Sequence, residues 1–259
     1  VAGWLQGPMD AKAWEALIPN MGYMALIRNL RNFEQAGISD EAKAKVIARI
    51  KDTDEIDRAR QFTFRFWSAY KNSSDFGYAG ALEDAMDYSI MNIPELTGRT
   101  LVLIDDSGSM DGLYSQKGTM SYAQQAGLFG ISLAKRNKGR VDAYPYSDSV
   151  RRRITKLERP VLRIMESIPN RGGGTYTNEA IAQKFDGHDR VIVLTDGQTW
   201  DRPGKDIKVP IYTFNIAGYD RGDRESGKND RYTFGGGLTD AAFKMIPLLE
   251  AGKNQDWPF

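Results

Sequence analysis

A short apolar strand that ends in a cluster of oxygen-bearing side chains is the feature that most constrains this chain. Residues 101–104 read Leu-Val-Leu-Ile, a run typical of a strand buried on both faces of a parallel sheet. The run leads at once into Asp105, Ser107 and Ser109, an Asp-x-Ser-x-Ser spacing. In open α/β sheets, ligand sites form at the carboxyl ends of the strands. The segment therefore predicts a site as well as a fold.

Two later segments repeat this arrangement of glycine, hydroxyl and carboxylate. Gly172-Gly173-Gly174-Thr175 forms a predicted loop, and the apolar run 191–194 leads into Thr195, Asp196 and Gly197. The three segments together offer two carboxylates and three hydroxyls, with no nitrogen or sulfur ligand among them. Such hard oxygen donors suit Mg²⁺ or Mn²⁺ and argue against zinc or copper.

These three motifs, in this order, resemble the metal-ion-dependent adhesion site of a von Willebrand A domain. The resemblance implies that the ligands of one divalent ion are Asp105, Ser107, Ser109, Thr175 and Asp196. Some of these residues would act through water. In the family an acidic residue usually follows the Gly-Gly-Thr motif, whereas Tyr176 stands there in this chain, which alters the surroundings of the site but not a ligand. Mg²⁺ tends to retain waters. We therefore expect a position at the ion for an Asp or Glu of a protein ligand.

The chain divides into two architectures. Residues 1–97 are predicted to form a helical-repeat segment, and residues 98–259 a von Willebrand A domain with a Rossmann-like, doubly wound, mostly parallel sheet. Apolar runs predict strands at 100–105, 140–146, 190–195 and 209–216. Between the first two, a helix near 119–135 carries a stripe of small residues that would let it lie close to the sheet: Ala123, Ala126, Gly127, Gly130 and Ala134.

Periodic apolar positions predict the helices of the first segment. One helix is expected over 23–33, one after the N-cap Ser39, one over 56–70 and one over 82–90. Short helices in series indicate stacked hairpins of a solenoid of the TROVE or HEAT-like kind, although no strict repeat period is found. In the second segment, Val150 to Lys156 is predicted to be an arginine-rich edge strand, and Thr239 to cap a final helix.

The helical segment is similar to a TROVE module, the module named for telomerase, Ro and vault proteins. The similarity lies in the heptapeptide Met24 to Leu30 and in the run Ala81 to Ile90, which leads through Thr97-Gly98-Arg99 into the metal strand. A Ro-like protein is a ring of helical repeats closed by the A domain. The resemblance implies an RNA-binding ribonucleoprotein scaffold that binds small non-coding Y-like RNA and misfolded RNA, and that works with an exoribonuclease in RNA quality control.

Composition limits the remaining possibilities. The 259 residues include no cysteine and carry a net charge of +1, so thiolate chemistry is excluded and a strongly basic nucleic-acid binder is not indicated. No apolar run approaches the roughly 18 residues of a membrane span, and no signal peptide is visible, which favours the cytoplasm and no membrane partner.

The start at Val1 leads us to expect a piece of a longer chain, with most of the helical ring upstream. Residues 1–98 hold 11 Lys and Arg against 14 Asp and Glu, a net charge of −3, so the RNA-binding basic residues are expected mainly upstream.

Several alternatives stay open from sequence. The oxygen-bearing residues could be a capped strand end with ordinary turns, although three ordered motifs would then coincide by chance. An A-domain adaptor without an RNA role is one further alternative, and a metal-dependent phosphohydrolase is another. Against catalysis, the Asp-x-Asp phosphatase pattern would need an aspartate at Ser107, no phosphate-binding P-loop occurs, and the single histidine, His188, is expected in a surface loop.

A basic cluster has two interpretations. Its members lie in and after the predicted edge strand: Arg151, Arg152, Arg153, Lys156, Arg159 and Arg163. They form either a solvated edge protected from aggregation or a phosphate-contacting rim that faces RNA. The cluster has no interleaved aromatics for stacking bases, which favours the first interpretation. Arg28 and Arg31 of the heptapeptide helix are expected to solvate its outer face.

Overall fold

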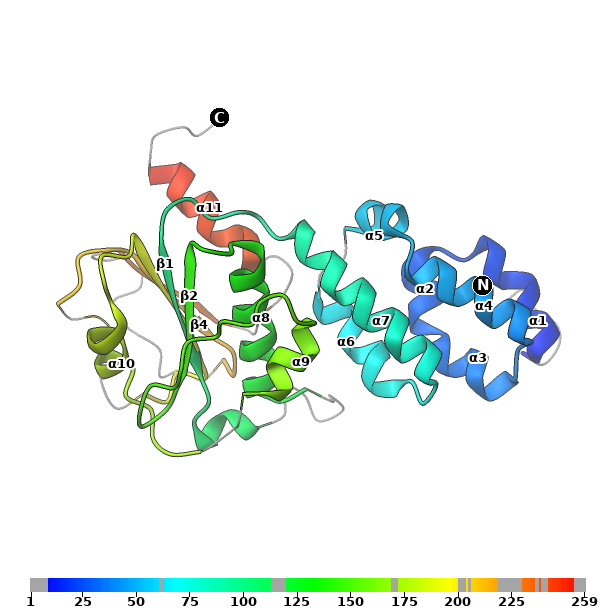
Figure 1. Cartoon of the computed structure of the whole chain (residues 1–259), viewed down its shortest axis with the longest axis horizontal. Helices are drawn as coiled ribbons and strands as arrows, with labels where there is room; N and C mark the ends of the chain where they lie inside the picture. Colours follow the sequence, from blue (N-terminus) through cyan, green and yellow to red (C-terminus); the bar gives the residue numbers. More distant parts are fainter. Residues whose placement is uncertain are drawn as a thin grey trace. The chain divides into compact units, whose positions relative to one another are not determined.

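The computed structural model describes residues 9–60, 63–112, 120–168, 172–199, 204, 206–218, 230–235, 238 and 242–253. The chain divides into two compact units, residues 1–92 and 93–259. Figure 1 shows that the first consists of helices and the second of a sheet with helices around it. The domain boundary between residues 97 and 98 stays a prediction.

Short helices build the first unit. Their bounds are α1 Ala11–Leu17, η2 Ile18–Asn20, α2 Tyr23–Arg28, α3 Leu30–Ala36, α4 Asp40–Ile50, α5 Thr53–Ala59, α6 Thr63–Asn72, α7 Phe76–Ser89 and η3 Ile90–Asn92. The predicted N-cap of α4 is confirmed, because the Ser39 side chain accepts a hydrogen bond from the backbone N–H of Ala42 at 3.3 Å. No helix in the described parts of the chain combines the length and apolar composition that crossing a bilayer requires.

Two predicted helices are each broken into two. The helix expected over 23–33 is interrupted at Asn29, whose side-chain amide donates to the carbonyl oxygen of Ala25 at 2.8 Å and so competes with the helical hydrogen bonds. The helix expected over 56–70 ends at Ala59, because Arg60 adopts the left-handed conformation with φ 48°. A left-handed residue at this point terminates a helix.

The second unit contains a five-stranded parallel sheet within its described residues. Its strands are β1 Thr100–Asp105, β2 Val141–Tyr146, β3 Arg190–Thr195, β4 Ile211–Asn215 and β5 Arg231–Gly235, in the order β2-β1-β3-β4-β5. The predicted doubly wound, Rossmann-like fold is confirmed, and all strand pairs are parallel. The analysis of the sequence missed β5, whose Tyr232 and Phe234 rings lie against Tyr212 and Phe214 of β4.

Helices cover both faces of this sheet. The remaining helical elements are η4 Gly108–Asp111, α8 Tyr122–Arg136, α9 Val161–Glu166, α10 Thr177–Lys184 and α11 Ala242–Lys253. In Figure 1, α8 and α9 lie on one side of the strands and α10 on the other. On the α10 side, Leu101 and Leu103 of β1 pack with Ile181 and with Val191 and Val193 of β3, all fully buried. Thr239, the predicted cap of the last helix, lies outside the described residues.

The predicted edge strand from Val150 to Lys156 is wrong. The segment runs beside β2, where the backbone N–H of Arg151 donates to Pro145 O at 2.8 Å and that of Ile154 to Ala143 O at 2.9 Å. Only an isolated bridge between Tyr146 and Val150 is formed. The ladder fails because Pro145 has no N–H to return a hydrogen bond.

The close packing of α8 on the sheet leads to a testable prediction. A Cβ added at Gly130 would lie 2.5 Å from Ile104 Cδ1 and 3.2 Å from Leu194 Cδ1. We expect Gly130→Ala to lower the free energy of unfolding by about 1–3 kcal/mol, since overpacking outweighs the gain in helix propensity. Urea unfolding followed by circular dichroism measures this.

Gly139→Ala is not a suitable control because of its positive φ, whereas Gly80→Ala, in a helix and with open space around it, should be neutral or stabilising. Equal stability of wild type and Gly130→Ala would contradict the packing.

Candidate metal centre

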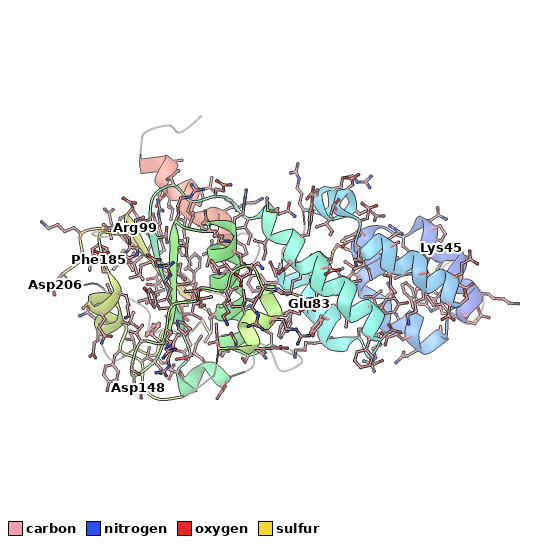
Figure 2. The ribbon with its side chains drawn as sticks, in the orientation of Figure 1. Lys45, Glu83, Arg99, Asp148, Phe185 and Asp206 are labelled. Carbon is pink, nitrogen blue, oxygen red and sulfur yellow. The ribbon has the colours of Figure 1, made fainter. Side chains whose placement is uncertain are left out.

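Two of the predicted ligands, Asp105 and Asp196, lie at the carboxyl-end edge of the sheet. Asp105 ends β1, Thr195 ends the neighbouring strand β3, and Asp196 follows it. Figure 2 shows Asp148, which follows β2, at this edge, and Arg99, which precedes β1, at the opposite one. The parallel arrangement of the strands is what brings residues distant in sequence to one edge.

The first loop turns tightly around the Asp105 carboxylate. Asp105 Oδ1 accepts a hydrogen bond from the backbone N–H of Ser107 at 2.9 Å, and Oδ2 accepts one from Thr195 Oγ1 at 2.6 Å. The hydroxyl oxygens of Ser107 and Ser109 lie 3.3 Å apart. Asp105 and Ser107 are fully buried and Ser109 is half-buried, so the loop presents its oxygens in a water-poor environment.

The glycine loop lies directly against this first loop. The backbone N–H of Gly108 donates to Gly173 O at 3.3 Å. Gly173 has φ +93°, and a Cβ there would lie 3.0 Å from Asp148 Oδ2, so both conformation and space require glycine. Thr175 is buried, and its carbonyl oxygen accepts a hydrogen bond from Thr199 Oγ1 at 3.3 Å. That contact joins the second loop to the third.

Asp196 carries an unused oxygen in the buried edge. Its side chain is fully buried, and Oδ1 accepts a hydrogen bond from the backbone N–H of Gln198 at 3.0 Å. Oδ2 has no hydrogen-bond partner among the described residues. A buried carboxylate oxygen without a partner is costly unless a cation or another donor satisfies it. A buried carboxylate oxygen without a donor fits a hard divalent cation.

The negative charges of the Asp105 and Asp196 carboxylates repel each other when no cation is bound. The pKa of Asp105 is raised to about 6, because burial and the negative charge of Asp196 outweigh the hydrogen bonds from Ser107 and Thr195, which lower it. Two buried carboxylates at one edge of the sheet are a suitable setting for a divalent ion. Within the described residues there is no group of three or more acidic or histidine side chains that could hold a metal, so the hydroxyls are needed for a ligand set here.

The raised pKa of Asp105 predicts a pH-dependent metal affinity. A cation competes with the proton, so Mn²⁺ affinity should be constant above pH 7 and fall by about tenfold per pH unit below pH 6. Isothermal titration calorimetry between pH 5 and pH 8 measures this, with buffers of different ionisation enthalpy to count the released proton. Thr195→Val removes a hydrogen bond that lowers the Asp105 pKa and should move the fall to higher pH. An affinity that does not change between pH 7 and pH 5 would exclude Asp105 as a ligand.

Two residues that support this edge were not predicted as site residues. Thr195 orients Asp105, as described above. Arg151 links the end of β1 to the loop after β2, because its Nε lies 3.4 Å from Asp106 Oδ2 and its Nη2 donates to Ser147 Oγ at 2.5 Å. Asp106 thus contacts Arg151, in a different environment from Asp105. Position in the sequence gave no signal for Arg151, which stood among several similar arginines.

The basic cluster is therefore not a uniformly free surface. Arg151 is largely buried in the contacts just described, and Arg153 Nη1 lies 2.7 Å from Asp142 Oδ1. Arg163 forms an exposed pair with Glu166. A groove of about 720 Å³ remains beside Arg151, Arg152 and Arg153. Whether the cluster contacts RNA stays a prediction.

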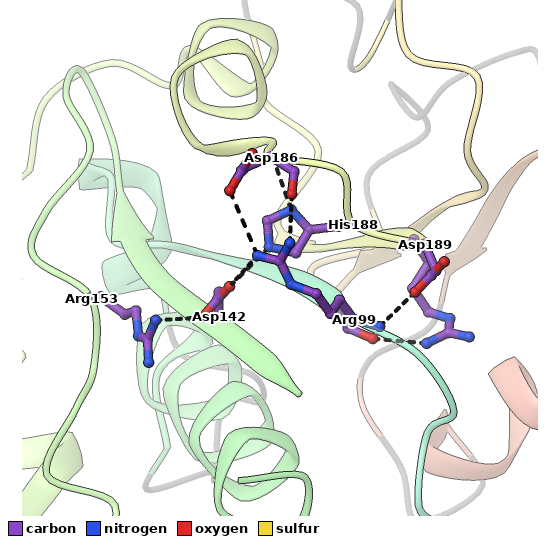
Figure 3. A network of polar contacts seen from close by, with 8 residues as sticks. Arg99, Asp142, Arg153, Asp186, His188 and Asp189 are labelled. Carbon is purple, nitrogen blue, oxygen red and sulfur yellow. Dashed lines mark hydrogen bonds and ion pairs between the residues drawn. The ribbon is translucent and has the colours of Figure 1, made fainter. Parts of the chain in front are cut away.

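The prediction that His188 lies in a surface loop is wrong. Its ring is buried, with Nε2 3.1 Å from Asp142 Oδ2 and Nδ1 accepting the backbone N–H of Asp186 at 3.1 Å (Figure 3). The positive φ of Gly187, 64°, turns the chain so that the ring faces inward. Burial raises the pKa of Asp142, but the hydrogen bond from His188 and the charges of Arg153 and Arg99 outweigh burial and hold that pKa below its usual value. This polar network lies at the amino ends of the strands, away from the candidate metal centre.

Fold and site together define a helical segment followed by an α/β domain of the von Willebrand A type. Comparison with known proteins agrees with this class. Residues 8–78 match the model of the TROVE domain family. The crystal structure of the Deinococcus radiodurans Ro (Rsr) protein superposes with a TM-score of 0.69 at 18% sequence identity, over 91% of this chain and 54% of that chain, which supports the shared fold. Residues 8–78 are thus similar to a TROVE domain, and the chain shares its fold with the Deinococcus radiodurans Ro protein.

The curated relatives match a short stretch of this chain. Telomerase protein component 1 of Rattus norvegicus and that of Mus musculus are each 39% identical to this chain over 62 residues. The match covers 23% of this chain but 2% of either relative. The chain therefore spans a small part of the length of these relatives, and they support the type of module without defining the activity of the whole chain.

Proposed function

We propose that this chain is part of an RNA-binding ribonucleoprotein scaffold of the Ro type, and that its partners are small non-coding, Y-like RNA and misfolded RNA. The observation that carries the proposal is the TROVE domain match over residues 8–78, joined to an α/β domain of the Ro fold. An exoribonuclease is the proposed protein partner in RNA quality control.

We further propose that the A domain contains a protein-docking site that depends on Mg²⁺ or Mn²⁺. Asp105 and Asp196 would hold the ion together with Ser107, Ser109 and Thr175. Two carboxylates balance the two positive charges, and the other ligands are neutral. Mg²⁺ tends to retain exchangeable waters, so an Asp or Glu of a protein ligand would replace one of them and complete the shell. The support is the buried, unpartnered Oδ2 of Asp196.

The proposed role is not catalytic. Asp105 is followed two residues later by Ser107, where a phosphohydrolase of the Asp-x-Asp type requires a carboxylate. His188, the single histidine of the sequence, lies before β3, whereas the candidate ligands lie at the other ends of the strands. A general base is therefore not available from histidine at this edge. Phosphatase turnover that needs Mg²⁺ and is lost in Asp105→Ala would overturn this part of the proposal.

Filter binding with a structured small RNA tests the RNA-binding role. At about 50 mM salt we expect binding, and at about 200 mM salt a steep loss of affinity, because phosphate contacts release counterions. The same assay with added Mn²⁺ should give the same affinity, since the metal centre is proposed for a protein ligand. Absence of RNA binding at the lower salt concentration would favour the alternative, an A-domain adaptor without an RNA role.

A further inference from the structure

A groove on the helical unit lies between the α2–α3 pair and α6. Its volume is about 420 Å³, and small-ligand pockets range from roughly 300 to 1,000 Å³. Arg28 at the end of α2, Arg31 in α3 and Arg65 in α6 all line it. Among the described residues that line the groove there is no Asp or Glu. Three cations are thus concentrated on a segment, residues 1–98, whose net charge is −3.

Arg28 and Arg31 differ from several other cations of this unit. Both are exposed, and within the described structure neither forms an ion pair. Other basic side chains of the unit are neutralised by partners, in the pairs Lys43–Asp75, Lys45–Glu41, Arg49–Glu55 and Lys51–Asp84. Guanidinium groups without a carboxylate partner are available for an external anion.

The carboxylate of Glu34, which is on α3, is engaged elsewhere. It accepts hydrogen bonds from Ser73 Oγ at 2.6 Å and from Ser74 Oγ at 2.9 Å. Burial raises the pKa of Glu34, but these hydrogen bonds outweigh burial and keep the pKa below its usual value, so the group is ionised at neutral pH. The contacts tie α3 to the connection between α6 and α7. The two walls of the groove are therefore linked before any ligand binds, which lowers the entropic cost of binding.

The lining combines positive charge with an apolar, partly aromatic surface. Ile27 and Leu30 are buried beneath the groove, and the Phe64 ring is half-buried in it. Arginine forks match phosphate oxygens in a bidentate manner, and a base stacks on an aromatic ring or a guanidinium plane. A nucleotide uses both features, whereas an acidic peptide side chain uses only the charge. A single-stranded segment is indicated, because only unpaired bases can reach such a surface.

We propose that Arg28, Arg31 and Arg65 bind the phosphates of a single-stranded RNA segment, with one base against Phe64. The inference rests on the proposed RNA-binding role and deepens it, because it assigns part of the RNA surface to this helical unit. The net negative charge of the unit predicts that it does not bind RNA. The inference therefore depends on the local arrangement of the arginines.

Fluorescence anisotropy with a labelled ten-nucleotide oligouridine tests the groove. The variant is Arg28→Gln/Arg31→Gln, and the matched control is Lys12→Gln/Lys45→Gln, which removes the same charge from exposed positions of the same unit that do not line the groove. We expect the arginine variant to bind at least tenfold more weakly at about 50 mM salt. Its slope of log affinity against log salt should be smaller by roughly 1.4, for two lost phosphate contacts. The control should change binding less than threefold, and circular dichroism should show both variants folded.

The outcomes separate failure of the groove from failure of the RNA role. If the wild-type chain binds structured RNA but the arginine variant keeps wild-type affinity for oligouridine, the proposal that the groove binds RNA is overturned. The proposed RNA-binding role of the chain then stands. Equal losses of oligouridine affinity in both double variants would show a non-specific anion surface. Displacement of oligouridine by polyglutamate at equal charge would show the same, and either result would overturn the proposal that the groove binds RNA. If the wild-type chain binds neither RNA, both proposals fail. Displacement by inorganic phosphate only at concentrations far above those of the oligonucleotide would support a nucleotide site over a free-phosphate site.

Discussion

Replacing Asp196 by alanine is expected to weaken Mn²⁺ binding by more than about a hundredfold. Asp196 would supply one of the two carboxylates of the site, and even supporting residues around a metal contribute roughly 10- to 100-fold in affinity. The same change should leave the metal-free protein as stable as before or more so, because it removes the unpartnered Oδ2 and the charge that opposes Asp105. Calorimetric titration with Mn²⁺ and urea unfolding in EDTA measure the two effects.

The control for this prediction is Asp186→Ala. Asp186 is also an aspartate of the A domain, but its side chain is 91% exposed and it lies in the network at the opposite edge of the sheet (Figure 3). Loss of its charge should change Mn²⁺ affinity by less than about threefold, because exposed charges at this distance are screened. If both variants lose affinity equally, the ion is attracted by general charge and is not held by Asp196.

Arg190→Met is expected to lower the free energy of unfolding by about 3–5 kcal/mol, the cost of breaking a buried ion pair. Arg190 begins β3, is 4% exposed, and forms a fork with Glu250 of α11, with Nε–Oε1 at 2.6 Å and Nη2–Oε2 at 2.9 Å. Its Nη1 donates to the carbonyl oxygen of Thr97 and to Thr100 Oγ1. One side chain thus joins the last helix, the central strands and the segment before β1. Urea unfolding monitored by circular dichroism gives the difference.

Two further variants show whether this effect belongs to the buried fork. Arg163→Met breaks an exposed pair with Glu166 and should cost less than about 0.5 kcal/mol. Arg190→Met/Glu250→Met should recover part of the loss, because no buried carboxylate is then left without its partner. A loss below about 1 kcal/mol in Arg190→Met would mean that water or neighbouring groups replace the fork, and the anchoring of α11 would have to be sought elsewhere.

The sequence predicted those parts of the fold that depend on local patterns. The runs 101–104 and 191–194 predicted two central strands, because a strand buried on both faces needs continuous apolar residues. Ser39 predicted the start of α4, because capping depends on a side chain and its own backbone. The small residues of α8 predicted its close approach to the sheet, where Gly130 faces Ile104.

Other features depend on neighbours that no local pattern contains. Strand β5 carries only Tyr232 and Phe234 as large apolar residues, and these rings find their partners on β4. His188 stands among polar residues in the chain, yet it is buried because Asp142 of β2 provides a hydrogen-bond partner for its Nε2. The edge strand was predicted from composition, and Pro145 of the adjacent strand prevented it. In each case a residue outside the local pattern decides the outcome.

The candidate site was predictable in its residues but not in its supports. Its ligand positions follow from motifs at strand ends, and the parallel sheet brings them to one edge. The hydrogen bond from Thr195 to Asp105 and the contact of Arg151 with Asp106 require the folded loops. The unpartnered oxygen of Asp196 likewise becomes visible only when the burial and the hydrogen bonds of that edge are known.

An anomalous difference map from a crystal of this chain grown with Mn²⁺ tests the central claim most directly. The account predicts one strong peak at the carboxyl-end edge of the sheet, with direct ligand oxygens at about 2.0–2.3 Å. Those oxygens should come from Asp105, Ser107, Ser109, Thr175 and Asp196, with waters mediating for some of them. A map with these loops ordered but with no peak among them, or with the ion bound elsewhere on the chain, would contradict it.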